Sequence, residues 1–133
     1  MSDTLIGLDQ LINQFEDNKS WDKQYRLIIQ LGKKLIKMSD KDKIDHNKVE
    51  GCESAAWLLI EKKEDCYFFQ MDSETRVVKG LMMILMIIYQ GKTVQQIRDI
   101  NIDQIFEKLG LLNHLSPSRT NGLLAIVQKI QRI

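Results

Sequence analysis

The spacing of apolar residues near the start of the chain predicts two amphipathic helices. The first has apolar positions at steps of three and four residues, at Leu5, Leu8, Ile12 and Phe15. Polar residues 18–20 interrupt this pattern, and Ser20 is a suitable N-cap for the second helix. The apolar face of the second helix is expected at Trp21, Tyr25, Ile28, Ile29 and Leu35. Gly32 lies inside this pattern and weakens the prediction for the later turns.

Two short runs of strand type follow a polar, aperiodic stretch over residues 37–48. These runs cover residues 55–60 and 66–71, and they are rich in aromatic and aliphatic side chains. The charged residues 61–65 separate them, so an antiparallel hairpin is the simplest prediction.

Cys52 comes just before the hairpin and is one of two cysteines. Residues 48–50 are expected to form a short edge strand, which would place Cys52 at a bend where Gly51 supplies backbone freedom. A free thiol has a pKa of about 8.5, so little thiolate is present at neutral pH. Glu50 and Glu53 would raise the pKa of Cys52 further if they lie close, because negative charge disfavours the thiolate. The residues around Cys52 therefore predict a thiol that is mostly protonated, and so weakly reactive, at neutral pH.

The second half of the chain predicts a central helix. Asp72 or Ser73 is expected to cap a helix that runs through Gln90. Residues 81–89 are apolar on every face, which indicates a buried helix, and Gly91 is expected to end it.

Further helices follow, and together the elements define a fold class. Two short helices are expected over residues 93–97 and 102–109, and Ser116 followed by Pro117 predicts the start of the last one. The apolar face of that helix is expected at Leu123, Ile126, Val127 and Ile130. The pattern predicts a single α+β domain over residues 1–133, with a small antiparallel sheet of about three strands packed against helices.

Composition narrows the classes of partner. Nineteen basic residues stand against 18 acidic ones, so net charge gives no reason to expect nucleic acid or an anionic membrane as the main partner. The first residues lack the pattern of a signal peptide, and the longest apolar run is far shorter than the roughly 20 residues that span a bilayer. We therefore expect a cytoplasmic protein with reduced cysteines.

The residues that could bind metal are few and badly spaced. Cys52, Cys66, His46 and His114 form no Cys-x-x-Cys or His-x-x-x-His pair, so no metal site is predicted. Both histidines lie in polar or helix-end contexts, where a solvated surface position is the simplest interpretation. Cys66 is expected to be a half-buried apolar residue of its strand. A Gly-x-Ser-x-Gly motif and a phosphate-binding glycine loop are both absent.

Six sequence fragments, in order, resemble one protein family. The fragment around the cysteine consists of Val49, Gly51, Cys52, Ser54 and Trp57. Before it stands YRLIIQLGKKL, and after it come DSE, VKGL and YQGKT. The last is LGLLNHLSPSRTNGL, which contains Ser116, Pro117, Ser118, Arg119 and Gly122. From about Trp21 to the C-terminus the chain is similar to the SufE/CsdE family of sulfur-acceptor proteins.

The resemblance implies a fold and a function. It implies a small antiparallel sheet packed against helices, similar to the iron–sulfur scaffold proteins. It further implies that Cys52 takes sulfane sulfur from a pyridoxal-phosphate (PLP) cysteine desulfurase as a persulfide and passes it to iron–sulfur cluster assembly or tRNA modification. This chain would bind no cofactor or metal, since PLP belongs to the desulfurase. The protein would be an accessory without a complete active site of its own.

The resemblance also suggests which residues support the cysteine. Gly51 and Ser54 belong to the cysteine motif, and Trp57 is expected in the core beneath it. Asp72 and Arg119 are expected either to have structural roles, as a helix cap and a first-turn arginine, or to support the cysteine loop or the partner contact. Cys66 is not part of the family pattern.

Two other functions remain open from the residues themselves. A thiol redox or peroxide-reducing protein could use Cys52 with Cys66, which requires Cα atoms closer than about 7 Å. A zinc-binding scaffold would instead contain bound metal. The sequence leaves open the partner desulfurase, the destination of the sulfur, the oligomeric state and the resting exposure of Cys52.

Overall fold

The computed structural model describes residues 7–49, 55–113 and 115–133. Its elements in order are α1 (Leu8–Asp17), α2 (Trp21–Gly32), the 3-10 turns η1 (Asp40–Asp42) and η2 (Asp45–Asn47), β1 (Ala56–Lys63), β2 (Cys66–Ser73), α3 (Arg76–Tyr89), β3 (Lys92–Thr93), α4 (Val94–Asp99), α5 (Ile102–Leu109) and α6 (Pro117–Gln131). The predictions made for Leu5, Gly51, Cys52, Ser54 and His114 lie outside the described residues.

The sheet is antiparallel with the strand order β1-β2-β3. Its hairpin pairs Ala56 with Ser73 at one end and Lys63 with Cys66 at the other. The predicted hairpin is therefore confirmed, although its strands extend into the charged residues that were expected to form the turn. Residues 61–63 are all exposed, so their charged side chains stay in solvent while their backbone continues the ladder with β2.

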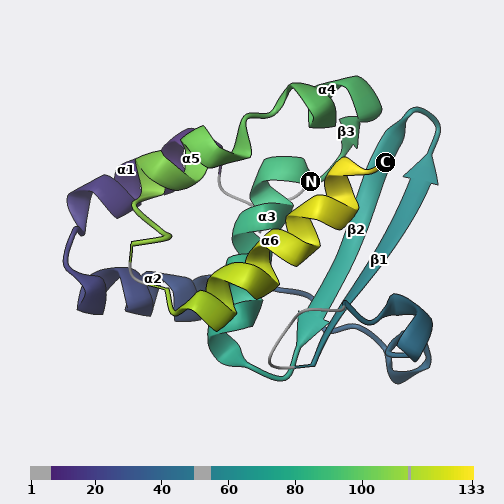
Figure 1. Cartoon of the computed structure of the whole chain (residues 1–133), viewed down its shortest axis with the longest axis horizontal. Helices are drawn as coiled ribbons and strands as arrows, with labels where there is room; N and C mark the ends of the chain where they lie inside the picture. Colours follow the sequence, from purple (N-terminus) through teal and green to yellow (C-terminus); the bar gives the residue numbers. More distant parts are fainter. Residues whose placement is uncertain (1–6, 50–54, 114) are drawn as a thin grey trace.

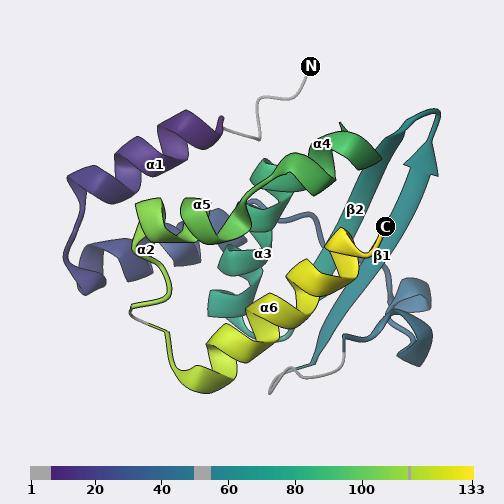
Figure 2. The same cartoon turned by 45° about the horizontal axis from the view of Figure 1, so that its top comes forward.

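The helices cover one face of this sheet, while η1 and η2 lie beside β1, away from α3 and α6 (Figure 1). Helix α3 runs back along β2 and contacts α2 and α6, so it is the centre of the core. Helix α1 packs against α5 on the side far from the hairpin (Figure 2). The predicted α+β class, with a small sheet against helices, is confirmed.

The third strand differs from the prediction. Lys48 makes only an isolated bridge with Trp57, and the third strand is formed by β3. Gly91, with a φ of 75°, turns the chain after α3, and its amide donates a hydrogen bond to the Tyr67 carbonyl (2.9 Å). Glycine suits this left-handed backbone, so the turn brings β3 to the edge of β2.

The cap of the central helix also differs. The N-cap of α3 is Thr75, and Asp72 and Ser73 are the last residues of β2. The prediction that Asp72 or Ser73 caps this helix was wrong because both continue the ladder opposite Trp57 and Ala56. The predicted burial of α3 is confirmed, since nine of its residues are buried.

Helix α2 ends at Gly32, before Leu35. A Cβ atom at Gly32 would lie 2.8 Å from the Gly80 amide nitrogen, and one at Gly80 would overlap the Ile28 carbonyl. The two glycines therefore let α2 and α3 cross at close range. This crossing rotates the buried face of α2, so Tyr25, predicted on the apolar face, is 42% exposed.

The last helices agree with the pattern. Thr93 caps α4 and Ser116 caps α6, each through its side-chain oxygen. The predicted apolar face of α6 is buried as a whole, at Leu123, Ile126, Val127 and Ile130.

Candidate functional site

The described residues on either side of segment 50–54 are held together. The Val49 amide donates a hydrogen bond to the Ala56 carbonyl (2.8 Å), and Lys48 bridges Trp57. Segment 50–54, which contains Cys52, therefore leaves and rejoins the described chain at one place, the end of the hairpin opposite its turn. The residues that flank this segment define the surroundings of the candidate site.

Asp72 lies at this end of the hairpin and is almost fully buried, with 1% of its surface exposed. Its Oδ2 accepts a hydrogen bond from the Met38 amide (3.0 Å), and its Oδ1 accepts one from the Ser73 amide (2.8 Å). The Nζ atoms of Lys43 and Lys79 lie 3.2 Å and 3.8 Å from the carboxylate. Burial alone raises the pKa of Asp72, but the two amides and Lys43 outweigh burial, so the pKa is lowered.

Trp57 stands opposite Asp72 in the ladder. It is half-buried and lies outside the hydrophobic cluster, so the prediction that it belongs to the core was wrong. Lys43 Nζ lies 5.2 Å from the centre of its ring, in the position of a cation–π contact. Lys43 thus contacts both the Trp57 ring and the Asp72 carboxylate.

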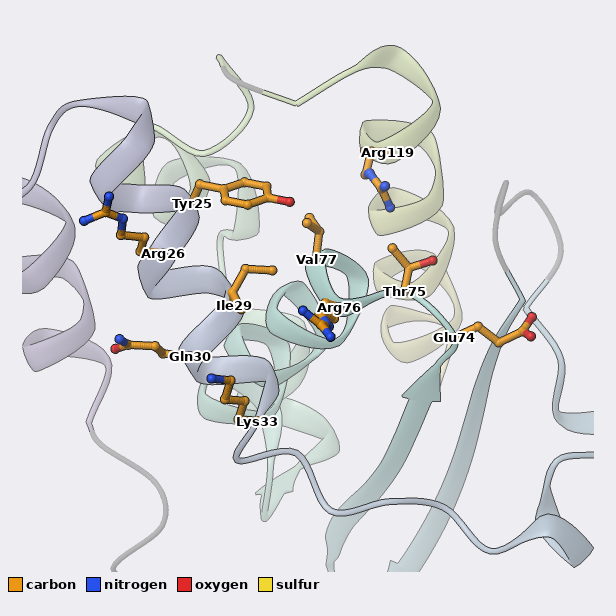
Figure 3. A pocket seen from close by; sticks show the side chains of 10 residues that line it. All are labelled: Tyr25, Arg26, Ile29, Gln30, Lys33, Glu74, Thr75, Arg76, Val77 and Arg119. Carbon is orange, nitrogen blue, oxygen red and sulfur yellow. The ribbon is translucent and has the colours of Figure 1, made fainter.

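Arg119 lines a cavity of about 690 Å³ between α2, the start of α3 and the start of α6. We call this the basic cavity, lined by Tyr25, Arg26, Ile29, Gln30, Lys33, Glu74, Thr75, Arg76, Val77 and Arg119. In Figure 3 the Tyr25 hydroxyl points towards Val77 and the Arg119 guanidinium points towards Thr75, while Glu74 points away. Among the described residues, neither Arg76 nor Arg119 forms an ion pair. The cavity therefore carries excess positive charge.

The basic cavity adjoins the end of the hairpin that holds Ala55. The Ala55 carbonyl accepts hydrogen bonds from the Ser73 hydroxyl (2.8 Å) and the Glu74 amide (3.3 Å). Glu74 also lines the cavity, so this wall is continuous with the backbone next to segment 50–54. Sequence reasoning singled out Arg119 but missed Arg26, Lys33 and Arg76. These residues come from two separate helices, and no local motif connects them.

The remaining candidate residues lie elsewhere. Cys66 is half-buried, as predicted, and pairs with Lys63 and Thr93 at the turn end of the hairpin. This is the opposite end from Ala56. His46 is exposed in η2, which confirms its predicted surface position.

Two further features are absent from the part of the chain that the structure describes. There, no group of three or more His, Cys, Asp or Glu side chains is arranged to hold a metal ion. Within the same residues, no helix combines the length and apolar character needed to cross a bilayer.

Comparison with known proteins shows which family this chain resembles. The family model described as "SufE: Fe-S metabolism associated domain" matches residues 9–133. An uncharacterized SufE-like protein of Rhizobium meliloti (strain 1021) is 36% identical over 131 residues, which cover 96% of this chain and 94% of that protein. An uncharacterized SufE-like protein of Rhizobium etli is 35% identical over 131 residues, covering 96% and 88%.

A solved structure supports the fold. The solution structure of a hypothetical protein from Thermus thermophilus superposes with a TM-score of 0.75. It covers 94% of this chain and 90% of its own at 14% identity, so the likeness concerns the fold alone.

The match defines an iron–sulfur metabolism domain, and the chain belongs to the SufE family. The predicted resemblance is thereby confirmed. Membership supports an accessory role in sulfur transfer, in a family generally associated with cysteine desulfurases.

Proposed function

We propose that this protein accepts sulfane sulfur on Cys52 from a PLP-dependent cysteine desulfurase. The observation that carries the proposal is the family match over residues 9–133, which includes the motif around Cys52. Cys66 has no role in this proposal, because it lies at the turn end of the hairpin and outside the motif.

The transfer is an exchange at sulfur. The Cys52 thiolate attacks the outer sulfur of a persulfide on the desulfurase cysteine, and a new S–S bond forms to Cys52 Sγ. The S–S bond within the desulfurase persulfide breaks, and the enzyme's cysteine leaves as a thiolate. No external oxidant is needed, because the sulfane sulfur moves between two thiolates.

In this proposal, Cys52 becomes a reactive thiolate only in the complex with the desulfurase. Glu50 and Glu53 flank the motif and disfavour a thiolate in the free protein if they lie close to the thiol. Docking would then have to supply positive charge or exclude the carboxylates. A Cys52 thiol pKa well below 7 in the free protein would contradict this part of the proposal.

The basic cavity is our candidate for part of the partner contact. Its positive charge, with Arg76 and Arg119 unpaired among the described residues, favours an acidic surface on the desulfurase. The cavity wall continues to Ala55, so a partner seated there would lie next to segment 50–54.

The rest of the proposed pathway follows from the same chemistry. The desulfurase contributes PLP, and this chain binds no cofactor of its own. The Cys52 persulfide passes its sulfur to a cluster scaffold or a tRNA-modification protein in the cytoplasm, without direct binding of nucleic acid or membrane.

Mass spectrometry tests the proposal. The protein is mixed with a purified cysteine desulfurase and cysteine, and its intact mass is measured without reductant. We expect a gain of one sulfur atom that is kept in Cys66→Ser and lost in Cys52→Ser. The same two variants separate this function from a redox pair, which would need both cysteines. No gain with any desulfurase would overturn the proposal.

A further inference from the structure

Asp72 connects three parts of the molecule at the end of the hairpin. Its carboxylate contacts the Met38 amide and Lys43 from the connection before β1, the Ser73 amide from its own strand, and Lys79 from α3. A buried carboxylate with this many donors is held in one place, because each oxygen is engaged on two sides.

The connection over residues 33–49 depends on such contacts. It contains only the two short 3-10 turns, η1 and η2, and leads directly into segment 50–54. Within it, Asn47 Nδ2 donates to the Asp42 carbonyl (2.8 Å), which shapes the connection but does not attach it to the sheet. Met38, which is 1% exposed, and Lys43 attach the middle of the connection through Asp72. Its last residues, Lys48 and Val49, meet β1 directly through the bridge to Trp57 and the hydrogen bond to Ala56.

Lys43 extends this attachment to the strand that follows segment 50–54. Its Nζ contacts the Asp72 carboxylate and also lies over the Trp57 ring. Trp57 in turn bridges Lys48, two residues before segment 50–54 begins. One buried carboxylate therefore helps to fix the chain on both sides of the segment that contains Cys52.

We propose that Asp72 is a positioning residue for sulfur transfer, which anchors residues 38–43 and so sets where the chain enters and leaves segment 50–54. This inference rests on the proposed function of Cys52. Asp72 takes no part in the exchange at sulfur. Its effect is geometric, because attack on a persulfide requires the thiolate to be aligned with the S–S bond.

The test compares Asp72→Asn with the wild-type protein in two assays. The first measures the rate of sulfur gain from a purified cysteine desulfurase supplied with cysteine. Asn retains an acceptor for one amide but removes the charge that holds Lys43, so we expect transfer to slow by about tenfold or more. The second assay measures alkylation of the free protein by iodoacetamide at each cysteine, and we expect the Cys52 rate to rise while Cys66 stays unchanged.

Two more variants separate positioning from loss of stability. Tyr89→Phe removes a partly buried hydrogen bond from Gln131 (3.0 Å) at the far end of α3, and we expect this variant to transfer sulfur at the wild-type rate. Lys43→Gln leaves Asp72 in place but removes the link to Trp57, and we expect it to reproduce the Asp72→Asn effects in a smaller degree. If Asp72→Asn does not fold, Lys43→Gln alone decides the question.

The outcomes are distinct. Wild-type rates in both assays for the folded Asp72 and Lys43 variants would overturn the inference and leave the proposed function intact. An equal loss in Tyr89→Phe would also overturn it, because the effect would then follow stability alone. If the wild-type protein itself gains no sulfur, the proposed function fails, whatever the alkylation rates.

Discussion

The two ends of the hairpin are held by different kinds of interaction. At the end that contains Ala56 and Ser73, a buried carboxylate collects two lysines and two amides. We call this the charged end. At the turn end, hydrogen bonds between neutral groups join the sheet to the end of α3, and the charged side chains of Lys62 and Lys63 lie over the rings of Tyr67 and Phe68 at the surface. The same strands and the same helix α3 connect the two ends, so the difference comes from the side chains at each.

The turn end is closed by Gln90 and Gly91. The Gln90 side chain accepts a hydrogen bond from the Phe69 amide (2.6 Å) and donates one to the Phe69 carbonyl (3.2 Å), as a strand would. The Gly91 amide donates to the Tyr67 carbonyl, and Tyr89 nearby bonds with Gln131. Neutral pairs of this kind satisfy the backbone without depending on pH or salt.

The charged end has the properties of a site. It places positive charge in the basic cavity and on Lys43, next to the backbone that leads into segment 50–54. Buried charge is expensive unless it is paired, and the Asp72 carboxylate is paired with two lysines and two amides. The comparison therefore supports our proposal that the charged end contributes to function, while the turn end belongs to the framework.

The largest expected effect is that of Asp72→Ala. Removal of the carboxylate leaves Lys43, Lys79 and two amides without their acceptor, so we expect a loss of about 3 kcal/mol in the free energy of unfolding. Lys43 and Lys79 are partly exposed and can be hydrated, which keeps the loss at the lower end for such pairs. Urea titration measures it, and a loss below about 1 kcal/mol would show that the charged end is not held by this carboxylate.

Gly80→Ala tests the crossing of α2 and α3, the two helices that line much of the basic cavity. The added methyl group would overlap the Ile28 carbonyl, so α2 and α3 must separate. We expect a loss of about 2–3 kcal/mol, in spite of the better helix propensity of alanine. Gly7→Ala, which has nothing within 4 Å of the added atom, is the control. Equal stability of the two variants in urea would contradict the close crossing.

Gln90→Ala is the matching change at the turn end. It removes two neutral hydrogen bonds to Phe69, and water can replace part of them because the site is only partly buried. We expect a loss of about 1–2 kcal/mol, with no change in sulfur transfer. A loss larger than that of Asp72→Ala would reverse the comparison between the two ends.

Acid should lower the free energy of unfolding by weakening the charged end. While the Asp72 carboxylate stays partly ionised, the loss should be smaller than that caused by Asp72→Ala. The pKa of Asp72 is lowered in the folded state from its ordinary value of 3.8, so its contribution to stability is complete above that value. The contribution is lost as the pH falls through the folded pKa. Stability measured between pH 6 and pH 2 should therefore fall more steeply in the wild-type protein than in Asp72→Asn. Parallel curves would show that another group controls the acid transition.

Much of the framework could be predicted because it depends on local pattern. The buried helix α3, the hairpin, and the caps at Thr93 and Ser116 follow from residues within a few positions of each other. The family could also be predicted, because ordered fragments of sequence carry it. The two-residue strand β3 could not, since pairing with β2 rather than composition makes it a strand.

The candidate site divides in the same way. The sequence by itself determined the class of protein and singled out Cys52, Asp72 and Arg119, whose roles remain proposals. Only the tertiary structure decided that Asp72 ends a strand, buried between Lys43 and Lys79, and that Arg119 shares a cavity with Arg76. Lys43 is far from Asp72 along the chain, and Arg119 is far from Arg76. Their meeting depends on how α2, α3 and the hairpin pack, and packing is a property of the whole fold that no local spacing encodes.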